Sequence, residues 1–365
     1  MKKTLSIFLT VVLFGACNVF ENKTEALFKA IASGDVPRVE KLIKSGADVN
    51  ARKKFNSEAI MAARGLPGGG TDTEIMPLLV AVDYCQKDKK ICAEMIQLLV
   101  DSGADVNAEV NGYPLPVMLT IFLDDTTYSI LIKAGANIAV QDKETGFTPL
   151  MMAAMQGNVP LIKLLLASKA DPNQKDNSGG TAVFQAANCL KTDKAVCADA
   201  VKALIGAGAD VNVKGKGGLT PMLSAAMGDN PYTIKVLAQA KADVNAKFGT
   251  SQMTPLMIAS SAFSKESVDA VKALLEAGAD PKLKNSKGET ASDIAFNAKN
   301  KALFFAARMT GVIPKIKGKI KEEDLLVMIE KFKGGTAQSA ADEEVARAKR
   351  AVEIYNILKQ AENKK

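Results

Sequence analysis

The sequence of 365 residues contains no histidine, so a serine or cysteine nucleophile would lack the base that usually activates it. It also lacks a phosphate-binding glycine loop, because the glycine-rich residues 65–70 are not followed by the lysine and Ser/Thr pair that such loops require. No other set of residues forms a recognisable chemical site. These absences predict a protein that is not an enzyme and that needs no cofactor.

A strong charge imbalance and a long apolar run are also missing. The net charge is +7, and without Lys2 and Lys3 there are 45 basic against 40 acidic residues. Basic and acidic residues alternate instead of forming one stripe, which argues against a nucleic-acid partner. The N-terminal apolar run from Leu5 to Phe14 is too short to cross a membrane as a helix.

The chain does contain a phrase, Gly-Ala-Asp-Val-Asn, that returns in identical or related form. Successive copies begin 57, 32, 34, 39, 33 and 37 residues apart, a period typical of a solenoid of stacked supersecondary units. The glycine suits a helix C-terminus that needs positive φ. The seven copies begin at Gly46, Gly103, Gly135, Lys169, Gly208, Lys241 and Gly278.

A second phrase precedes the first in each period, and its clearest forms start at Thr148, Thr220 and Thr254, each followed by proline. Threonine caps helices and proline fits their first turn, so this phrase predicts helix starts. Looser forms begin at Met76, Tyr113, Thr181 and Thr290. With these two phrases, residues 24–310 resemble the ankyrin-repeat family. The resemblance implies an all-α solenoid of about eight helix-turn-helix units with finger loops.

One departure from that family is the missing histidine, which bridges neighbouring loops in its repeats. The hydrogen bonding between loops therefore needs another partner, whereas the apolar stack does not depend on it. The count of units starts with helices near 26–31 and 39–43 and closes near 302–307. Beyond them, residues 311–365 hold two helical patterns, 322–333 and 341–359, which we expect to cap the last repeat. A loosely attached basic tail is the alternative.

The N-terminus predicts export. Lys2 and Lys3 precede the apolar run, and Gly15 and Ala16 precede Cys17, so residues 1–16 have the pattern of a signal peptide. The segment resembles a bacterial lipoprotein signal, although Phe14 stands where that family has leucine. The resemblance implies acylation of Cys17, a lipidated linker at 17–23, and anchoring to a bacterial membrane on its periplasmic or surface-facing side. An ordinary cleaved signal peptide is the alternative.

The four remaining cysteines lie in two repeats that are longer than the others. The spacing from the second phrase to the first is 27 residues in these two units, against 21 or 22 in three others. Each pair encloses a charged segment between the two helices of its unit. In an exported protein this pattern predicts the local disulfides Cys85 to Cys92 and Cys189 to Cys197.

Two other interpretations of the cysteines are weaker. A shared zinc site would have to span three repeats, which is too far for one ion, so we expect no metal. Redox catalysis is disfavoured because neither pair has the two-residue spacing that lowers a thiol pKa.

In the ankyrin family the residue before the threonine lies exposed on a finger loop. The resemblance therefore implies a partner-binding surface at Phe147, Leu219, Met253, Lys143, Lys216 and Lys247. In the alternative, the apolar three only pack against the neighbouring finger. We expect a protein that binds an unidentified protein partner. An inhibitor or immunity-like protein and a thiol-active protein of oxidative-stress protection are the other possibilities.

Overall fold

The computed structural model describes residues 22–55, 73–85, 87–110, 112–187, 189, 193–262, 264–309 and 338–364. The chain divides into two compact units, residues 1–177 (unit 1) and residues 178–365 (unit 2). Cys17, the rest of the predicted signal segment and the tail pattern at 322–333 lie outside the described residues.

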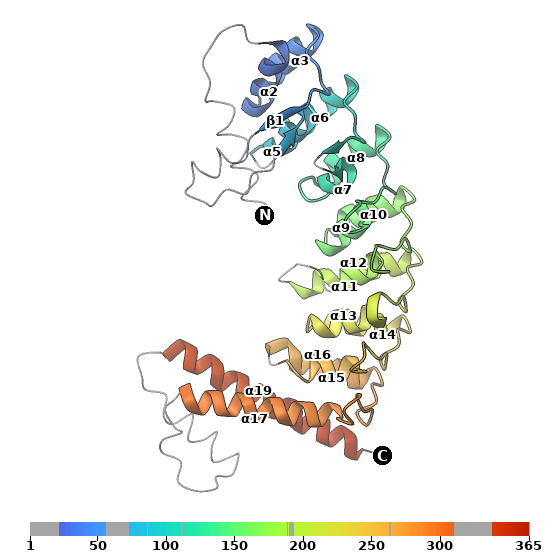
Figure 1. The fold of residues 1–365 in the computed structure, drawn as a ribbon, viewed down its shortest axis with the longest axis vertical. Coiled ribbons are helices and arrows are strands. Elements are labelled where there is room, and N and C mark those ends of the chain that lie inside the picture. Colours follow the sequence, from blue (N-terminus) through green and yellow to red (C-terminus); the bar gives the residue numbers. More distant parts are fainter. Residues whose placement is uncertain are drawn as a thin grey trace. The chain divides into compact units, whose positions relative to one another are not determined.

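Unit 1 is built from pairs of short antiparallel helices joined to the next pair by a loop or a small hairpin (Figure 1). Its helices are α2 (Lys23–Ser33), α3 (Val36–Lys44), α5 (Pro77–Tyr84), α6 (Lys89–Asp101), α7 (Leu115–Leu119), α8 (Asp125–Lys133), α9 (Pro149–Met155) and α10 (Val159–Ala167). Its strands are β1 (Lys53–Phe55), β2 (Thr73–Ile75), β3 (Glu109–Val110) and β4 (Tyr113–Pro114).

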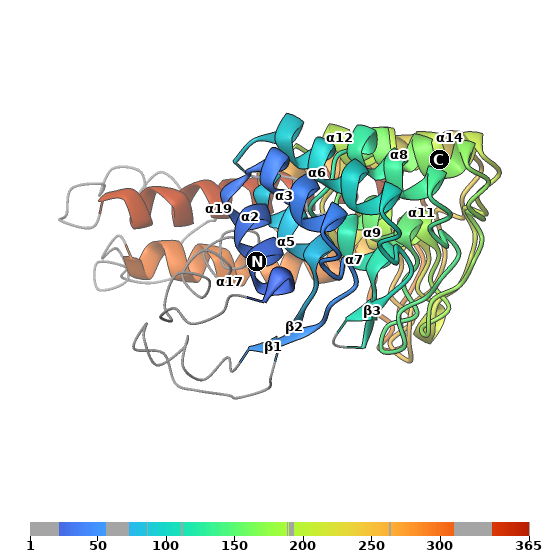
Figure 2. The same ribbon diagram turned by 90° about the horizontal axis from the view of Figure 1, so that it is seen from above.

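The strands of unit 1 form two antiparallel hairpins at the finger positions. In the β1–β2 hairpin Lys53 pairs with Ile75, and in the β3–β4 hairpin Glu109 pairs with Pro114. Figure 2 shows β1 and β2 projecting away from the helices of unit 1. The fingers therefore stand out on one side of the helix layer.

Unit 2 continues the pattern with three helix pairs and ends with two long helices (Figure 1). Its elements are α11 (Ala182–Ala187), α12 (Lys194–Gly206), the 3₁₀ turn η1 (Lys216–Gly218), α13 (Pro221–Met227), α14 (Pro231–Gln239), α15 (Pro255–Ala259), α16 (Lys265–Glu276), α17 (Ala291–Met309) and α19 (Gln338–Asn363). First helices pack on first helices and second on second, because α11, α13 and α15 contact in turn, as do α12, α14 and α16.

The predicted threonine caps are confirmed. The hydroxyl oxygens of Thr148, Thr220 and Thr254 each accept the backbone N–H three residues further on, at 3.2 to 3.3 Å. Proline is the first helical residue after each of them, where its missing N–H leaves no bond unmade. This phrase therefore fixes where the first helix of each repeat begins.

The first three residues of the Gly-Ala-Asp-Val-Asn phrase have separate local roles, which the copy at Gly103 illustrates. Gly103 has a φ of 85°, as the helix end requires. Ala104 is buried, and the carboxylate of Asp105 accepts the N–H of Asn107 at 2.8 Å, which closes the turn. Lys169 and Lys241 replace the glycine in two copies and still take φ values of 68° and 66°.

The asparagine that ends the phrase links one repeat to the next. The side-chain amide of Asn50 donates to Gly103 O at 2.9 Å, and its oxygen accepts the N–H of Asp105 at 2.7 Å. In unit 2, Asn212 makes the same two bonds, to Lys241 O at 3.3 Å and from Asp243 N at 2.8 Å. Asn107 bridges to the Gly135 copy in the same way, but that copy ends in Ala139, so the amide bridges join most and not all consecutive copies.

The segment near residues 302–307 that closes the predicted count of units is helical, but it is the end of a longer helix and not a separate second helix. Helix α17 runs unbroken over residues 291–309. The glycine that interrupts earlier units, as at Gly157 and Gly228, has no counterpart in this segment, and its alanines and lysines favour continued helix. The predicted helix at 341–359 is confirmed and is longer, since α19 covers residues 338–363.

Helix α19 packs against α17 and α16 (Figure 1). Its inward side chains are almost fully buried, and Lys272 of α16 pairs with Glu353 of α19 at 3.0 Å. Between α17 and α19, Lys299 is only 2% exposed and its ammonium lies 4.2 Å from the centre of the Tyr355 ring. The inward residues of α19 are Val345, Ala348, Ala351, Ile354 and Leu358. This helix therefore covers the apolar face of the last repeat.

Candidate protein-binding surface

The finger loops of the described repeats are closed by one recurring main-chain hydrogen bond. Because each loop is closed at its base, its tip is held in a defined conformation. The closing bonds run from Asp142 N to Phe147 O (3.0 Å), from Gly215 N to Leu219 O (2.8 Å), from Phe248 N to Met253 O (2.9 Å) and from Asn285 N to Glu289 O (3.0 Å).

The Asp142 side chain shows how one finger of unit 1 is held. Its carboxylate accepts the N–H groups of Glu144, Thr145 and Phe147 at 2.7 to 3.0 Å. Burial acts to raise the pKa of Asp142, but hydrogen bonds from Thr145, Phe147 and Glu144 outweigh it and hold the pKa below its usual value. The charged carboxylate is therefore the form that orders this loop.

Main-chain hydrogen bonds also join one finger to the next, so histidine is not needed for this purpose. In unit 1, Asn177 N donates to Thr145 O at 3.0 Å, and the amide of Gln141 adds a bond to Lys175 O at 2.8 Å. In unit 2 the bonds run from Lys216 N to Ser178 O (2.7 Å), from Gly249 N to Gly217 O (2.9 Å) and from Ser286 N to Ser251 O (2.9 Å).

The structure places the three apolar finger residues differently from the prediction. Phe147, Leu219 and Met253 are half-buried and not exposed, so the expected row of exposed apolar side chains is wrong. For Met253 the reason is visible, because its sulfur accepts a weak hydrogen bond from Asn285 of the next finger at 3.8 Å. The lysines are exposed as predicted, namely Lys143, Lys216 and Lys247.

Exposed large apolar side chains occur elsewhere. Tyr113 begins the β4 strand and is 41% exposed. Met227 and Tyr232 flank the turn between α13 and α14 and are 54% and 56% exposed. No pattern in the sequence marked Met227 or Tyr232 as exposed, whereas Tyr113 stands where other repeats have threonine.

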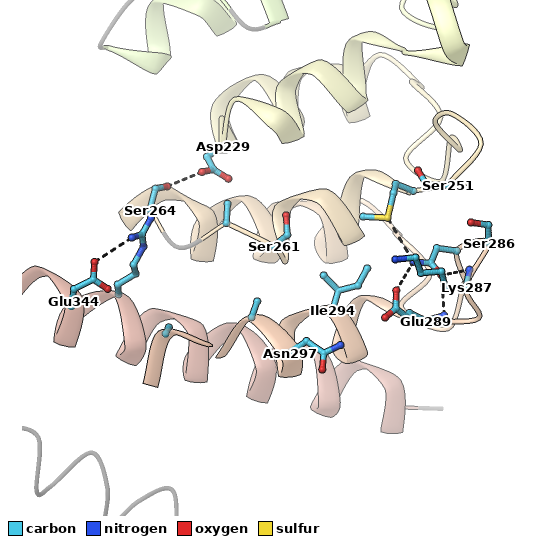
Figure 3. A pocket seen from close by; sticks show the side chains of 16 residues that line it. Asp229, Ser251, Ser261, Ser264, Ser286, Lys287, Glu289, Ile294, Asn297 and Glu344 are labelled. Atoms are coloured by element: carbon cyan, nitrogen blue, oxygen red, sulfur yellow. Dashed lines mark hydrogen bonds and ion pairs between the residues drawn. The ribbon is translucent and has the colours of Figure 1, made fainter. Parts of the chain in front are cut away.

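A groove of about 750 Å³ in unit 2 lies between the ends of α15 and α16, the neighbouring fingers, and α17 with α19 (Figure 3). At one end Ser264 donates to Asp229 at 2.9 Å and Arg347 pairs with Glu344 at 3.3 Å. The finger residues Ser251, Ser286, Lys287 and Glu289 line the other end (Figure 3). Met253 and Asn285, which hydrogen-bond to each other, also line the groove. Of the predicted binding residues, this groove contains Met253 alone.

The four repeat cysteines form two disulfides, Cys85 with Cys92 and Cys189 with Cys197. Their Cα atoms are 4.8 and 5.5 Å apart, which is within the range that a disulfide spans. Each bond closes the loop between the two helices of its repeat, α5 with α6 and α11 with α12.

Both disulfide loops end in the same residues, Asp-Lys-x-x-Cys, and this shared pattern is a signal for residues that join repeats. In the second loop Asp193 caps α12 by accepting the N–H of Ala195 at 3.0 Å. The ammonium of Lys194 donates to the carbonyls of Gly228 and Asp229 in the next repeat, at 2.7 and 2.9 Å. In the first loop the corresponding Lys89 lies 3.6 Å from Asp124.

The described residues contain neither a metal-binding cluster nor a membrane-spanning helix. Among them no group of three or more histidine, cysteine, aspartate or glutamate side chains could hold a metal ion. In the same part of the chain no helix has the length and apolar character needed to span a membrane.

Residues 117–197 and 192–285 match a family model described as ankyrin repeats in three copies. The chain is 34% identical over 127 residues to ankyrin repeat protein nuc-2 of Neurospora crassa, a match that covers 33% of this chain and 11% of that protein. It is 35% identical over 235 residues to palmitoyltransferase ZDHHC13 of Mus musculus, covering 63% of this chain and 36% of that protein.

A third relative is the ankyrin repeat and SAM domain-containing protein 6 of Rattus norvegicus, 36% identical over 107 residues, which are 28% of this chain and 11% of that protein. The chain thus matches only about a tenth to a third of the length of these three relatives. The matched segments, the helix pairs and the finger loops agree with one another: the chain has an all-α ankyrin-repeat fold and carries ankyrin repeats over residues 117–285.

Proposed function

We propose that this chain is an exported, membrane-anchored ankyrin-repeat protein that binds another protein and catalyses no reaction. The observation that carries the binding role is the set of ankyrin repeats with closed finger loops that hydrogen-bond to one another. Stacked repeats of this kind present a rigid, extended surface, which suits a protein partner. The absence of histidine from the whole sequence supports the lack of catalysis.

Two observations support export. The segment from Lys2 to Cys17 has the charge, apolar length and small residues of a signal sequence. The two local disulfides suit an oxidising compartment, because thiols of cytosolic proteins are kept reduced. A thiol-active role is less well supported, since all four repeat cysteines are paired and Cys92 and Cys197 are buried.

The anchor is proposed to be acylated Cys17. At about 0.8 kcal/mol per buried methylene, two or three long acyl chains would hold the protein on a bilayer. In the expressing bacterium, Cys17→Ser should move the protein from the detergent phase to the aqueous phase. A variant that stays in the detergent phase would refute lipidation.

The binding role is tested by crosslinking the native membrane fraction and identifying the attached protein by mass spectrometry. We expect one partner whose crosslinks fall on the finger loops and first helices of the repeats. Crosslinks that are spread evenly over the surface, or that join the chain only to lipid, would contradict the proposal.

A further inference from the structure

Exposed lysines are concentrated on the three finger loops of unit 2, at residues 212–219, 245–253 and 282–289. These loops contain a single acidic residue, Glu289, which is half-buried and accepts a hydrogen bond from Asn285 at 3.0 Å. We call the lysines of these loops the basic strip. They are Lys214, Lys216, Lys247, Lys282, Lys284 and Lys287.

On the fingers of unit 1 three cations pair with acidic neighbours, whereas the exposed Lys54 and Lys175 have no carboxylate within ion-pair distance among the described residues. Three ion pairs there are Arg52 with Glu74 at 3.0 Å, Lys53 with Glu25 at 2.6 Å and Lys143 with Glu109 at 2.8 Å. Over the described part of unit 2, none of the six lysines of the basic strip lies within ion-pair distance of a carboxylate. The charge of Lys284 acts in part on Asp293, whose pKa it helps to lower, and the positive charge of the other five lysines is available to a ligand.

The basic strip is also ordered before any ligand arrives. Lys216 N is itself one of the donors that tie each finger to its neighbour, and Gly249 and Ser286 supply the next two bonds at 2.9 Å. The lysines therefore recur at the spacing of the repeats, about 8 to 10 Å for packed helices. Like charges held in a row at this spacing repel one another, and bound carboxylates would relieve that repulsion.

The groove described above begins where the basic strip ends. Lys287 lies at its mouth together with the hydroxyl groups of Ser251 and Ser286 (Figure 3). Hydroxyl and ammonium groups both donate to carboxylates, and the half-buried Met253 offers an apolar surface beside them. The far end of the groove holds Asp229 and the Arg347–Glu344 ion pair, whereas at the finger end Lys287 has no ion pair among the described residues and Glu289 is held by Asn285, so a negatively charged ligand is favoured at the finger end.

We propose that the basic strip binds an extended, acidic segment of the partner protein. This inference rests on the proposed protein-binding function and specifies the chemistry of the partner. A chain in the extended polyproline II conformation has three residues per turn and advances about 3.1 Å per residue, so carboxylates three residues apart lie on one face, about 9 Å apart, and match successive fingers. The segment would thus be about seven to nine residues long, with an acidic residue at every third position.

The test compares two triple variants of the full chain. Lys214→Glu, Lys247→Glu and Lys284→Glu reverse the strip, whereas Lys202→Glu, Lys235→Glu and Lys265→Glu make the same charge change on exposed second helices of unit 2. The probes are a nine-residue peptide with glutamate at every third position, a peptide of the same composition with its glutamates adjacent, and vesicles containing 30% phosphatidylglycerol. Circular dichroism melts check that both variants fold.

We expect the strip variant to bind the spaced peptide at least tenfold more weakly than wild type does. The affinity of the control variant for this peptide should stay within twofold of wild type. Wild type should bind the clustered peptide less tightly than the spaced one. Equal losses in both variants would overturn the proposal in favour of net charge alone. Strip-dependent binding to vesicles without binding to the peptide would overturn it in favour of a lipid surface. If crosslinking still finds a protein partner in either case, the proposed function stands and only the basic strip is excluded.

Discussion

Two lysines occupy a backbone conformation that the other copies of the phrase give to glycine. In Lys169 and Lys241 the positive φ forces the Cβ atom close to a carbonyl oxygen, which costs roughly 1 kcal/mol or more for a residue with a side chain. Both positions follow helix ends that need this conformation. The two copies therefore carry a local strain that the glycine copies avoid.

We predict that Lys241→Gly raises the free energy of unfolding by about 0.5 to 1 kcal/mol, since relief of strain exceeds the extra entropy of the unfolded chain. Gly208→Ala is the matched control. A Cβ at Gly208 would meet no atom within 4 Å, so its expected loss of about 1 kcal/mol reflects φ alone. Urea unfolding measures both, and a destabilised Lys241→Gly would contradict this account.

Asp83, near the end of α5, is a weaker acid than an ordinary aspartate, because its pKa is raised. Burial raises its pKa from 3.8 to about 6, although the charge of Lys87 acts in the opposite direction. Because the folded state binds the proton more tightly than the unfolded state, this group favours folding below about pH 4, and the benefit is lost as the pH rises to about 6.

Replacing Asp83 by asparagine should therefore remove the contribution of this carboxyl group to the pH dependence of folding stability. We expect the melting temperature of Asp83→Asn to exceed that of wild type above pH 6, with the difference shrinking or reversing towards pH 4. Melts across this range provide the measurement. A difference between the two proteins that does not change with pH would show that Asp83 does not titrate there.

At the scale of elements, the disulfide loop of residues 189–197 fixes the start of α12 and thereby the position of Lys194. The lysine makes two charge-assisted hydrogen bonds to the next repeat, and its own carbonyl accepts one from Asn230 at 3.1 Å. The disulfide therefore stabilises its own repeat, and Lys194 at the start of α12 joins that repeat to the next one.

We predict that Lys194→Ala lowers the free energy of unfolding of unit 2 by about 1.5 to 3 kcal/mol, as expected for loss of hydrogen bonds to a charged group. The control Lys202→Ala removes an exposed ion pair with Asp199 in the same helix and should cost less than about 0.5 kcal/mol. Replacing both Cys189 and Cys197 by alanine should cost about 2 to 3 kcal/mol in the chain-entropy treatment. Chemical denaturation of each variant measures the loss of stability. Equal losses for Lys194→Ala and Lys202→Ala would refute the role of Lys194 in joining the two repeats.

The elements also show how far sequence reasoning reaches. Helix starts were predictable because Thr148 and its equivalents cap through purely local bonds. The burial of Met253 was not, since it depends on Asn285, 32 residues away. The unbroken α17 could have been inferred from the missing glycine, and Lys194 from the shared Asp-Lys-x-x-Cys pattern. The groove needed the placement of α19, which no local pattern specifies.

At the scale of the whole molecule, the chain consists of two compact units whose repeats contact their neighbours. In such a protein stability is roughly a sum of repeat and interface contributions, so damage stays near its origin. Helix α19 packs on α16 and α17 of unit 2 through buried residues such as Leu358.

We therefore predict that Leu358→Ala, which should cost about 2 to 5 kcal/mol for a buried leucine, speeds amide hydrogen exchange in α15, α16 and α17. Exchange in α2 to α6 of unit 1 should be unchanged. The exposed Gln360 gives a control, since Gln360→Ala should alter neither region. Faster exchange throughout both units would show that the molecule unfolds as one cooperative body.

The amide bridge between consecutive phrases has a consequence for how the number of repeats can change. Asn245 still receives the N–H of Asp280 at 2.9 Å, but the final copy carries Lys282 where the bridging asparagine would stand. A duplicated period that ends in asparagine would bring its own bridge and fit between its neighbours. A copy of the last period, or of the one at Gly135, which carries Ala139 at this place, would not, so duplication without loss of the bridge is confined to the periods that end in asparagine.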